Sequence, residues 1–359
     1  MNREQFFGRL AALDEERLRK TLWSLYWRGT EVVRERIEAE IDPDQASSKK
    51  AASVQSVDPE LVLDDVRNSV ALARSGSYMG GDRRVSPRER SRWRFTFQRL
   101  AADAQACLMT EDPRTASAAM EELIDFVCEL HDYDYFHTED AVEAARFVVS
   151  DAAVMLWRRI YEHDGFPAFA SVAASQLIRW ESAHGWTRGF GRVAEAETSL
   201  ASAIAGMLRN HDAWVAFADR YLEALDKAAG GDEPDREHSF RRPKHVREDR
   251  AANLSAWHML MFDKLFDPET EDRLDRLLTH PALGGPELAI FQARLAQRRG
   301  NLGLARKLVS ASLEKLPGHH AFLNFAIEID APLPARARQI HNERVRAEKL
   351  AGKTHRDGS

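Results

Sequence analysis

The sequence has few of the features that mark secreted, disulfide-linked or membrane-spanning proteins. Its 359 residues include two cysteines, Cys107 and Cys128, too few for a disulfide framework or a four-cysteine zinc site. No apolar run approaches the roughly 20 residues that cross a membrane. The first residues lead into mixed charge rather than into the apolar core of a signal peptide. We therefore expect a cytoplasmic protein with no membrane partner.

Glycine and proline are also scarce, with 19 and 13 residues, which leaves room for long uninterrupted helices. Alternation of the kind that marks strands is nearly absent, whereas apolar residues recur at spacings of three and four. A hydrophobic content of 44% supports a folded core. The pattern predicts an all-α fold. It also predicts a helix from Thr138 to Tyr161, on one face of which lie Ala141, Ala145, Val148, Val149, Ala152, Leu156 and Ile160.

Three Asp-Pro pairs predict where helices begin. Asp58-Pro59, Asp112-Pro113 and Asp267-Pro268 each place a carboxylate directly before a proline. The carboxylate can accept hydrogen bonds from free backbone N–H groups at the start of a helix. Proline loses nothing at the first helical position, because an N–H there would have no partner within the helix. We therefore expect a helix to start at each of these positions.

Two stretches of small, polar and charged residues interrupt the helical pattern. Residues 46–57 are small and aperiodic, which predicts a flexible linker, and residues 229–245 are rich in charge and helix breakers. The predicted organisation is a helical pair at 1–45, the linker at 46–57, a helical body at 58–228, a charged linker at 229–245, helical repeats at 246–350 and a frayed tail at 351–359.

The most regular spacing lies toward the C-terminus. Small, turn-forming and apolar residues are separated there by seven, five, four, three and five positions: Ala293, Gly300, Ala305, Val309, Ser312 and Pro317. The alanines let two antiparallel helices approach closely, the glycine permits a tight turn, and the proline ends the second helix. Residues 286–318 resemble the tetratricopeptide repeat (TPR), and this resemblance implies a helical hairpin that stacks on similar neighbours.

The match to this repeat is partial. Ser312 stands where the family usually has alanine, and the first helix has Ala289, Gln292 and Ala296 in place of large aromatic residues. One repeat cannot bury its own apolar face, so several neighbouring hairpins are required. Two architectures stay open: a helical-hairpin solenoid that is TPR-like toward the C-terminus, and a plain helical bundle that carries a chance match.

The net charge of −6 is distributed unevenly along the chain. Residues 83–99, 236–250 and 336–356 carry +6, +3 and +5, so the rest of the chain carries −20. An acidic body with three basic segments indicates that charge contributes to the choice of partner.

The first basic segment combines arginines with aromatic residues. Its candidate binding residues are Arg83, Arg84, Arg88, Arg90, Arg92, Arg94 and Trp93, and those of the second segment are Arg241, Arg242 and Lys244. Arginines neutralise phosphates and aromatic rings stack on bases, while an acidic protein subunit would use the same charges. The alternative is a helix that begins near Ser86-Pro87, with its arginines outward and Trp93 and Phe97 inward.

His-Asp occurs three times, at His131, His163 and His211. In an all-α protein this resembles the HD metal-dependent phosphohydrolases. The resemblance implies that His131, His163, Asp164 and Asp212 hold a divalent cation, which would polarise a phosphoryl oxygen and activate water. The alternative is that the pairs mark helix ends, since each lies where a long helical pattern stops.

Together these observations favour a non-enzymatic scaffold or adaptor whose stacked helical hairpins bind a protein partner, with no cofactor and no metal. In a sharper version the protein is a subunit of a larger assembly, and its basic, aromatic segment contacts nucleic acid or an acidic subunit. The alternative function is a metal-dependent phosphohydrolase built on the His-Asp pairs.

Overall fold

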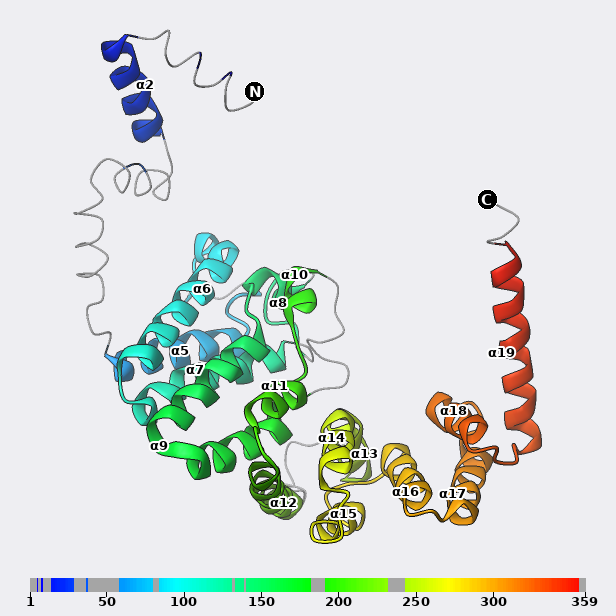
Figure 1. Cartoon of the computed structure of the whole chain (residues 1–359). Coiled ribbons are helices and arrows are strands. Elements are labelled where there is room, and N and C mark those ends of the chain that lie inside the picture. Colours follow the sequence, from blue (N-terminus) through cyan, green and yellow to red (C-terminus); the bar gives the residue numbers. More distant parts are fainter. Residues whose placement is uncertain are drawn as a thin grey trace. The chain divides into compact units, whose positions relative to one another are not determined.

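The computed structural model describes residues 5, 8, 14–28, 37, 58–79, 84–130, 133–138, 140–181, 191–231 and 243–354. Every regular element within these ranges is a helix, which confirms the predicted all-α class. The chain divides into two compact units, Met1–Val57 and Asp58–Ser359, whose helices are labelled in Figure 1. The predicted linker at 46–57, and most of that at 229–245, lies outside the described residues.

The first unit contains helix α2 (Glu15–Arg28). The side chain of Asp14 accepts a hydrogen bond from the backbone N–H of Arg17 at 2.7 Å and so caps the start of this helix. The rings of Trp23 and Trp27, one turn apart, stack with their centroids 5.9 Å apart. Both rings are largely exposed, which places these two tryptophans on the surface of the unit.

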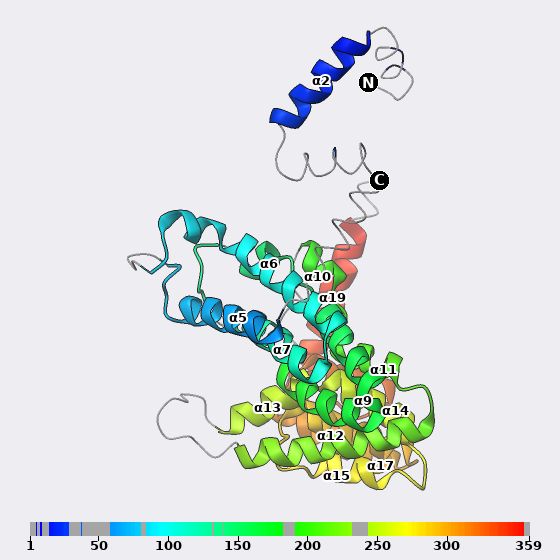
Figure 2. The ribbon, with the colours of Figure 1, turned by 90° about the vertical axis from the view of Figure 1, so that its left-hand side faces the viewer.

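The second unit begins with three helices that pack against one another, seen together in Figure 2: α5 (Pro59–Arg74), α6 (Pro87–Thr110) and α7 (Pro113–Glu129). Asp58 and Asp112 cap α5 and α7 as predicted, each accepting a backbone N–H two residues later. Helix α6 starts with a complete capping box, in which Ser86 and Glu89 each accept the other's backbone N–H. Local sequence therefore determines where all three helices begin.

The predicted helix over Thr138–Tyr161 is wrong as a single element. The structure breaks it into α8 (Ala141–Ala145) and the start of α9 (Val149–Trp180), with Arg146 between them in the left-handed region at φ 54°. Helix α9 begins at Val149 because the carboxylate of Glu197 accepts the backbone N–H groups of Val149 and Ser150, at 2.5 and 2.9 Å. A distant side chain therefore decides where this helix starts.

Two further helices also begin at carboxylates that lie far away in the sequence: α10 (Arg192–Ala196) and α11 (Leu200–Met207). Glu143 accepts the backbone N–H groups of Arg192 and Val193, at 3.2 and 2.9 Å. Glu181 accepts the backbone N–H of Ala201 at 2.9 Å. These contacts fasten the second half of the helical body to α8 and α9 through otherwise unsatisfied helix ends.

The helix-end interpretation of the His-Asp pairs holds for one described pair and fails for the other. After His163 and Asp164, Gly165 adopts φ 82° and kinks α9. His211, by contrast, starts α12 (His211–Gly231) rather than ending a helix. The reason is the side chain of Asn210, which accepts a backbone N–H of the first turn at 2.8 Å and acts as the cap. The pair at His131 lies outside the described residues.

The C-terminal part of the second unit consists of helices that mostly contact their neighbours in chain order. They are α13 (Pro243–Asn253), α14 (Ser255–Leu265), α15 (Asp272–Leu278), α16 (Pro286–Arg298), α17 (Leu302–Lys315), α18 (His320–Glu328) and α19 (Ala335–Thr354). Helix α16 packs against α13, α14, α15 and α17, and α17 packs against α18 and α19.

The predicted helix start at Asp267-Pro268 is wrong in position. Asp267 does accept the backbone N–H of Glu269 at 3.0 Å, as a cap would. The chain nevertheless stays in a turn until α15 begins at Asp272. The buried hydroxyl of Thr270 donates to the carbonyl of Leu265 at 2.9 Å and ties this turn to the end of α14.

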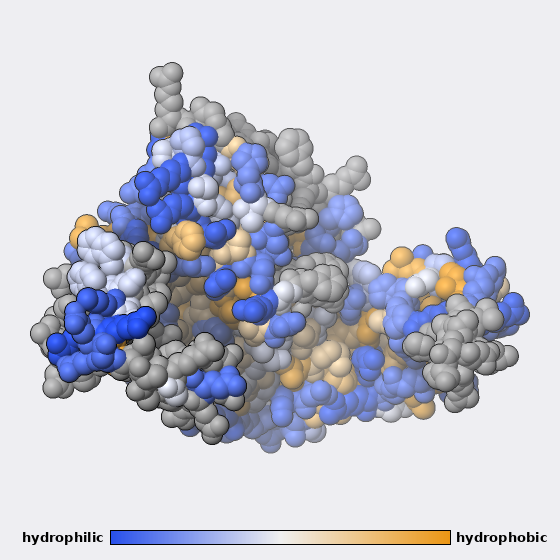
Figure 3. Space-filling model, turned by 90° about the horizontal axis from the view of Figure 1, so that it is seen from above, coloured by the Kyte–Doolittle hydropathy of each residue, from blue (hydrophilic) through white to orange (hydrophobic). Residues whose placement is uncertain are grey.

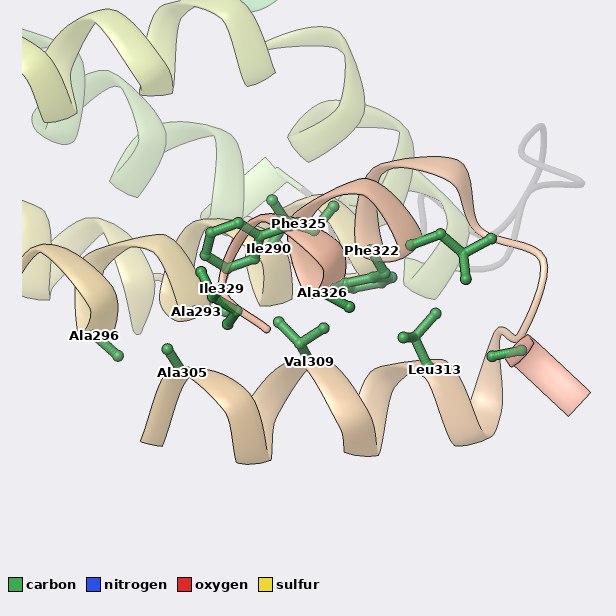
Figure 4. Close-up of a cluster of buried hydrophobic side chains, with 12 residues drawn as sticks. Ile290, Ala293, Ala296, Ala305, Val309, Leu313, Phe322, Phe325, Ala326 and Ile329 are labelled. Carbon is green, nitrogen blue, oxygen red and sulfur yellow. The ribbon is translucent and has the colours of Figure 1, made fainter. Parts of the chain in front are cut away.

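Helices α16 and α17 form a tightly packed hairpin. Ala293 and Ala305 are fully buried where the two helices approach each other, and Gly300 makes the turn between them at φ 77°. Figure 4 shows Val309 and Leu313 of α17 pointing toward residues of α16 and α18. The small residues thus act as expected, and they let one core extend over three consecutive helices.

Hydrophilic residues predominate on the face of the molecule in Figure 3, with hydrophobic areas scattered between them. In the part of the chain that the structure describes, no helix combines the length and the apolar character needed to cross a membrane.

Candidate functional site

A groove of about 400 Å³ lies between α14, α16 and α18. These three helices alternate along the chain with α15, α17 and α19, so the groove collects every second helix of the C-terminal part. Its lining is mostly apolar and consists of Ser255, Ala256, His258, Met259, Glu287, Ile290, Phe291, Arg294 and Ala321. Apolar concavities with a few polar groups are the usual form of binding sites on proteins.

The apolar lining comes from residues that also hold the helices together. Ile290 and Phe291 are almost fully buried, on the side of α16 that faces α14 and α18. The ring of Phe291 meets that of Phe262 of α14 edge-to-face, with centroids 5.4 Å apart. The lining is therefore anchored in the core, and a ligand would meet a preformed surface.

Arg294 is the cation of the groove. It is half-buried, and its guanidinium carbon lies 4.8 Å from the centroid of the Phe325 ring. Within the described parts of the chain no carboxylate lies within ion-pair distance of this guanidinium. A cation held in an apolar setting without a counter-charge favours an anionic group on a ligand.

Glu287 is the acidic residue of the groove, and His319 lies beside it outside the lining. The Nε2 atom of His319 lies 4.0 Å from a carboxylate oxygen of Glu287. The Nδ1 atom of His319 is buried and, within the described residues, has no hydrogen-bond partner. Glu287 and Arg294 lie seven residues apart on the same helix, α16, so the groove carries a carboxylate near one end and a guanidinium about 10 Å further along the helix axis, which gives a bound segment a preferred direction.

His258 contributes a neutral ring to the groove. Its Nε2 atom lies 2.7 Å from the hydroxyl of Tyr221, and both side chains are buried. Burial lowers the pKa of His258 to about 3 and raises that of Tyr221 well above its ordinary value. Neither group changes charge near neutral pH, so this part of the lining is suited to packing rather than to proton transfer.

The structure also defines the surroundings of the first basic segment. Arg88, Arg92 and Arg94 are exposed on α6, together with Phe95, which is 52% exposed. We refer to these four residues as the basic face of α6. Arg90 is half-buried, and Arg84 donates to the hydroxyl of Ser75 at 3.3 Å.

Trp93 is buried and does not belong to a binding surface. Its ring stacks on Phe136 with centroids 3.8 Å apart, and its indole N–H donates to the hydroxyl of Thr138 at 3.2 Å. Phe97 is buried beside it, as the alternative interpretation predicted. Sequence spacing missed Phe95 as the exposed aromatic residue. Helical spacing could have identified it, because Phe95 lies two positions from both Trp93 and Phe97 and therefore on the opposite side of the helix.

Several predicted binding residues cannot be placed on either surface. Arg83, Arg241 and Arg242 lie outside the described residues, and Lys244 is described only as part of the backbone of α13.

The described residues of the predicted phosphohydrolase site, His163, Asp164 and Asp212, do not meet in a metal cluster. His163 Nδ1 lies 3.2 Å from a carboxylate oxygen of Asp164. The same carboxylate accepts hydrogen bonds from Arg114, which lower its pKa. Asp212 lies in the first turn of α12, and His131 is outside the described residues. Among the residues with described positions, no three His, Cys, Asp or Glu side chains are close enough to share a metal ion.

Comparison with known proteins yields no relative. No family model matches the chain, and neither curated proteins nor solved structures match it.

Proposed function

We propose that this protein is a non-enzymatic helical scaffold that binds a segment of a protein partner in the groove between α14, α16 and α18. The observation that carries the proposal is the groove itself. It is lined by three alternate helices, its apolar lining is preformed, and it contains one half-buried guanidinium, that of Arg294, with no carboxylate of the described residues within ion-pair distance. Recognition rather than catalysis suits a lining in which the histidine is neutral and buried.

The proposed architecture is a short TPR-like array. Helices α14–α15, α16–α17 and α18–α19 would be three successive hairpins, and their first helices would line the groove. Packed alanines and the turn glycine of the α16–α17 hairpin support this arrangement, as does the packing of α17 against both α16 and α18. Stacking of such units produces an extended concave surface that single helices cannot form.

The proposed ligand is a peptide segment with two or three apolar side chains and one acidic side chain. The apolar side chains would cover Ala256, Met259 and Ala321, which line the groove and keep exposed apolar surface, so that their burial is favourable. The acidic side chain would pair with Arg294, whose fixed position over Phe325 reduces the entropy lost on binding. Glu287 would disfavour acidic side chains at the other end of the groove and so set the orientation.

A peptide-display selection against the full-length protein tests this function. We expect enriched peptides that combine apolar residues with an aspartate or glutamate. Ala256→Arg places a long cation in the groove and should abolish their binding, because Ala256 is exposed and lines the groove. Ala311→Arg is the matched control, since Ala311 is exposed on α17 and does not line the groove. Failure to enrich any peptide, or equal binding to both variants, would contradict the proposal.

A further inference from the structure

The three arginines of the basic face of α6 have no acidic partner among the described residues, whereas many other arginines of the second unit do. Ten described arginines of this unit each have a carboxylate oxygen within 4.0 Å: Arg74, Arg99, Arg114, Arg159, Arg179, Arg220, Arg273, Arg276, Arg298 and Arg299. Among the described residues, no such partner is found for Arg88, Arg92 or Arg94. Three arginines that lie close together on α6 thus remain available to an external anion.

The start of α6 adds to this positive charge. Free backbone N–H groups and the helix dipole make the first turn positive, and acidic residues are the ones that stabilise it. Here Glu89 is the acidic residue of the first turn, and the Ser86 capping box already engages its carboxylate. Arg88 lies in the same turn and Arg92 one turn later. Arg88 therefore stands where helix stability would favour an anion, and an external anion would relieve this repulsion.

An aromatic ring lies within the same surface. Arg88, Arg92 and Phe95 follow one another at spacings of four and three, which places them on one side of the helix. Arg94 extends over the Phe95 ring, with its guanidinium carbon 4.9 Å from the ring centroid. The opposite side of α6 is fixed in the core by Trp93 and Phe97, so the surface is presented on a rigid support (Figure 2).

We propose that the basic face of α6 binds single-stranded nucleic acid. The arginines would pair with successive phosphates, and Phe95 would stack on an unpaired base. Arg88 and Phe95 are seven residues apart, about 10 Å along the helix axis, a distance that a few nucleotides can span. An isolated exposed ring between cations suits a base better than it suits the apolar face of a protein, because polar and charged residues of α6 surround it. This site is carried by helices other than those that line the groove, so it does not depend on the proposed peptide binding.

Fluorescence anisotropy with a labelled 20-nucleotide oligothymidylate and the full-length protein tests the proposal. We expect binding that weakens steeply with salt. The triple variant Arg88→Gln, Arg92→Gln, Arg94→Gln should bind at least tenfold more weakly and should reduce the slope of log K against log salt by about 2, because each phosphate contact contributes about 0.7 for a single strand. Phe95→Ala should weaken binding about tenfold, and Phe95→Trp should retain it.

The matched control removes the same charge elsewhere. Arg67, Arg158 and Arg209 are exposed on other parts of the second unit, and replacing all three by glutamine should change binding less than threefold. Ala256→Arg in the groove should also leave oligonucleotide binding intact, which separates this site from the proposed peptide site. The proposal is overturned if the control triple weakens binding as much as the basic-face triple, if the oligonucleotide does not bind, or if a glutamate-rich peptide displaces it at lower concentration.

Discussion

The helical body at α5–α12 and the hairpins at α14–α19 are held together in different ways. In the body, buried polar groups link elements that are far apart in sequence. The indole N–H groups of Trp157 and Trp180 donate to Gln176 and Asp125, both at 2.7 Å, and distant glutamates start three of the helices. From α16 to α19, a continuous apolar cluster of alanine, valine, leucine, isoleucine and phenylalanine joins consecutive helices.

This difference in packing suits the two regions to different kinds of binding surface. A polar network has fixed partners and directions, which suits a rigid base that presents a charged helix such as α6. In the C-terminal helices, α14, α16 and α18 leave a mostly apolar groove between them, which suits the binding of a ligand. The effects of substitutions on the free energy of unfolding and on its pH dependence should therefore differ between the two regions.

The largest expected effect is loss of the apolar core of the hairpins. Phe322 is fully buried in the cluster shown in Figure 4. Phe322→Ala removes a ring and leaves a cavity, which should lower the free energy of unfolding by about 4 kcal/mol. Urea denaturation followed by circular dichroism measures this loss. Phe95→Ala, the same substitution at an exposed site, should cost less than about 0.5 kcal/mol, and equal losses would contradict the assigned core.

The next effect concerns pH and the junction between the two regions, where Tyr221 of α12 meets His258 of α14. The pKa of His258 is about 3 in the folded protein and near 6.5 when unfolded. The unfolded state therefore binds the proton more readily. The contribution of His258 to the free energy of unfolding is fully present above pH 6.5 and is lost as the pH decreases toward 3. Between pH 7 and pH 5, the titration of His258 alone should lower the free energy of unfolding by about 2 kcal/mol.

Comparison with His258→Gln isolates this contribution. Glutamine does not titrate and keeps an acceptor for the Tyr221 hydroxyl. Over the same pH interval, the free energy of unfolding of the variant should therefore fall by about 2 kcal/mol less than that of the unchanged protein. Chemical denaturation at the two pH values provides the measurement. An identical loss for both proteins would show that His258 is not buried as a neutral ring.

The smallest effect is a contrast between two glycines, one from each region. At Gly191, with φ 122°, an added Cβ would lie 2.6 Å from a carboxylate oxygen of Glu143, which caps α10. At Gly300, with φ 77°, an added Cβ would meet nothing within 4 Å. Gly191→Ala should lower the free energy of unfolding by about 2 kcal/mol, and Gly300→Ala should lower it by about 1 kcal/mol. Thermal unfolding of both variants tests this order, and a reversed order would mean that the carboxylate caps contribute little.

Sequence patterns predicted features that neighbouring residues determine better than features that depend on distant residues, for a physical reason. Helix periodicity, Asp-Pro caps and close-packed alanines act over a few residues, and the positions of Asp58, Asp112, Ala293 and Ala305 were read correctly from them. The break at Arg146 depends on a carboxylate 51 residues away, at Glu197, and no local pattern reveals it.

The candidate sites follow the same rule. The basic face of α6 is a local pattern and was largely predicted from sequence, except that Phe95 rather than Trp93 is the exposed ring. The groove depends on how α14, α16 and α18 stack. Arg294 is unremarkable in sequence, and its importance follows from the aromatic ring of Phe325 and the absence of a nearby carboxylate among the described residues.

Partner binding in the groove is tested most directly by a double-mutant cycle between Arg294 and the acidic residue of a selected peptide. Isothermal titration would compare the full-length protein with Arg294→Gln, each with the peptide and with its amide-substituted counterpart. The predicted result is that each single change weakens binding about tenfold and that the two together cost little more, a coupling of about 1.4 kcal/mol. Independent, additive effects, or unchanged affinity in Arg294→Gln, would contradict the assignment of this groove as the binding site.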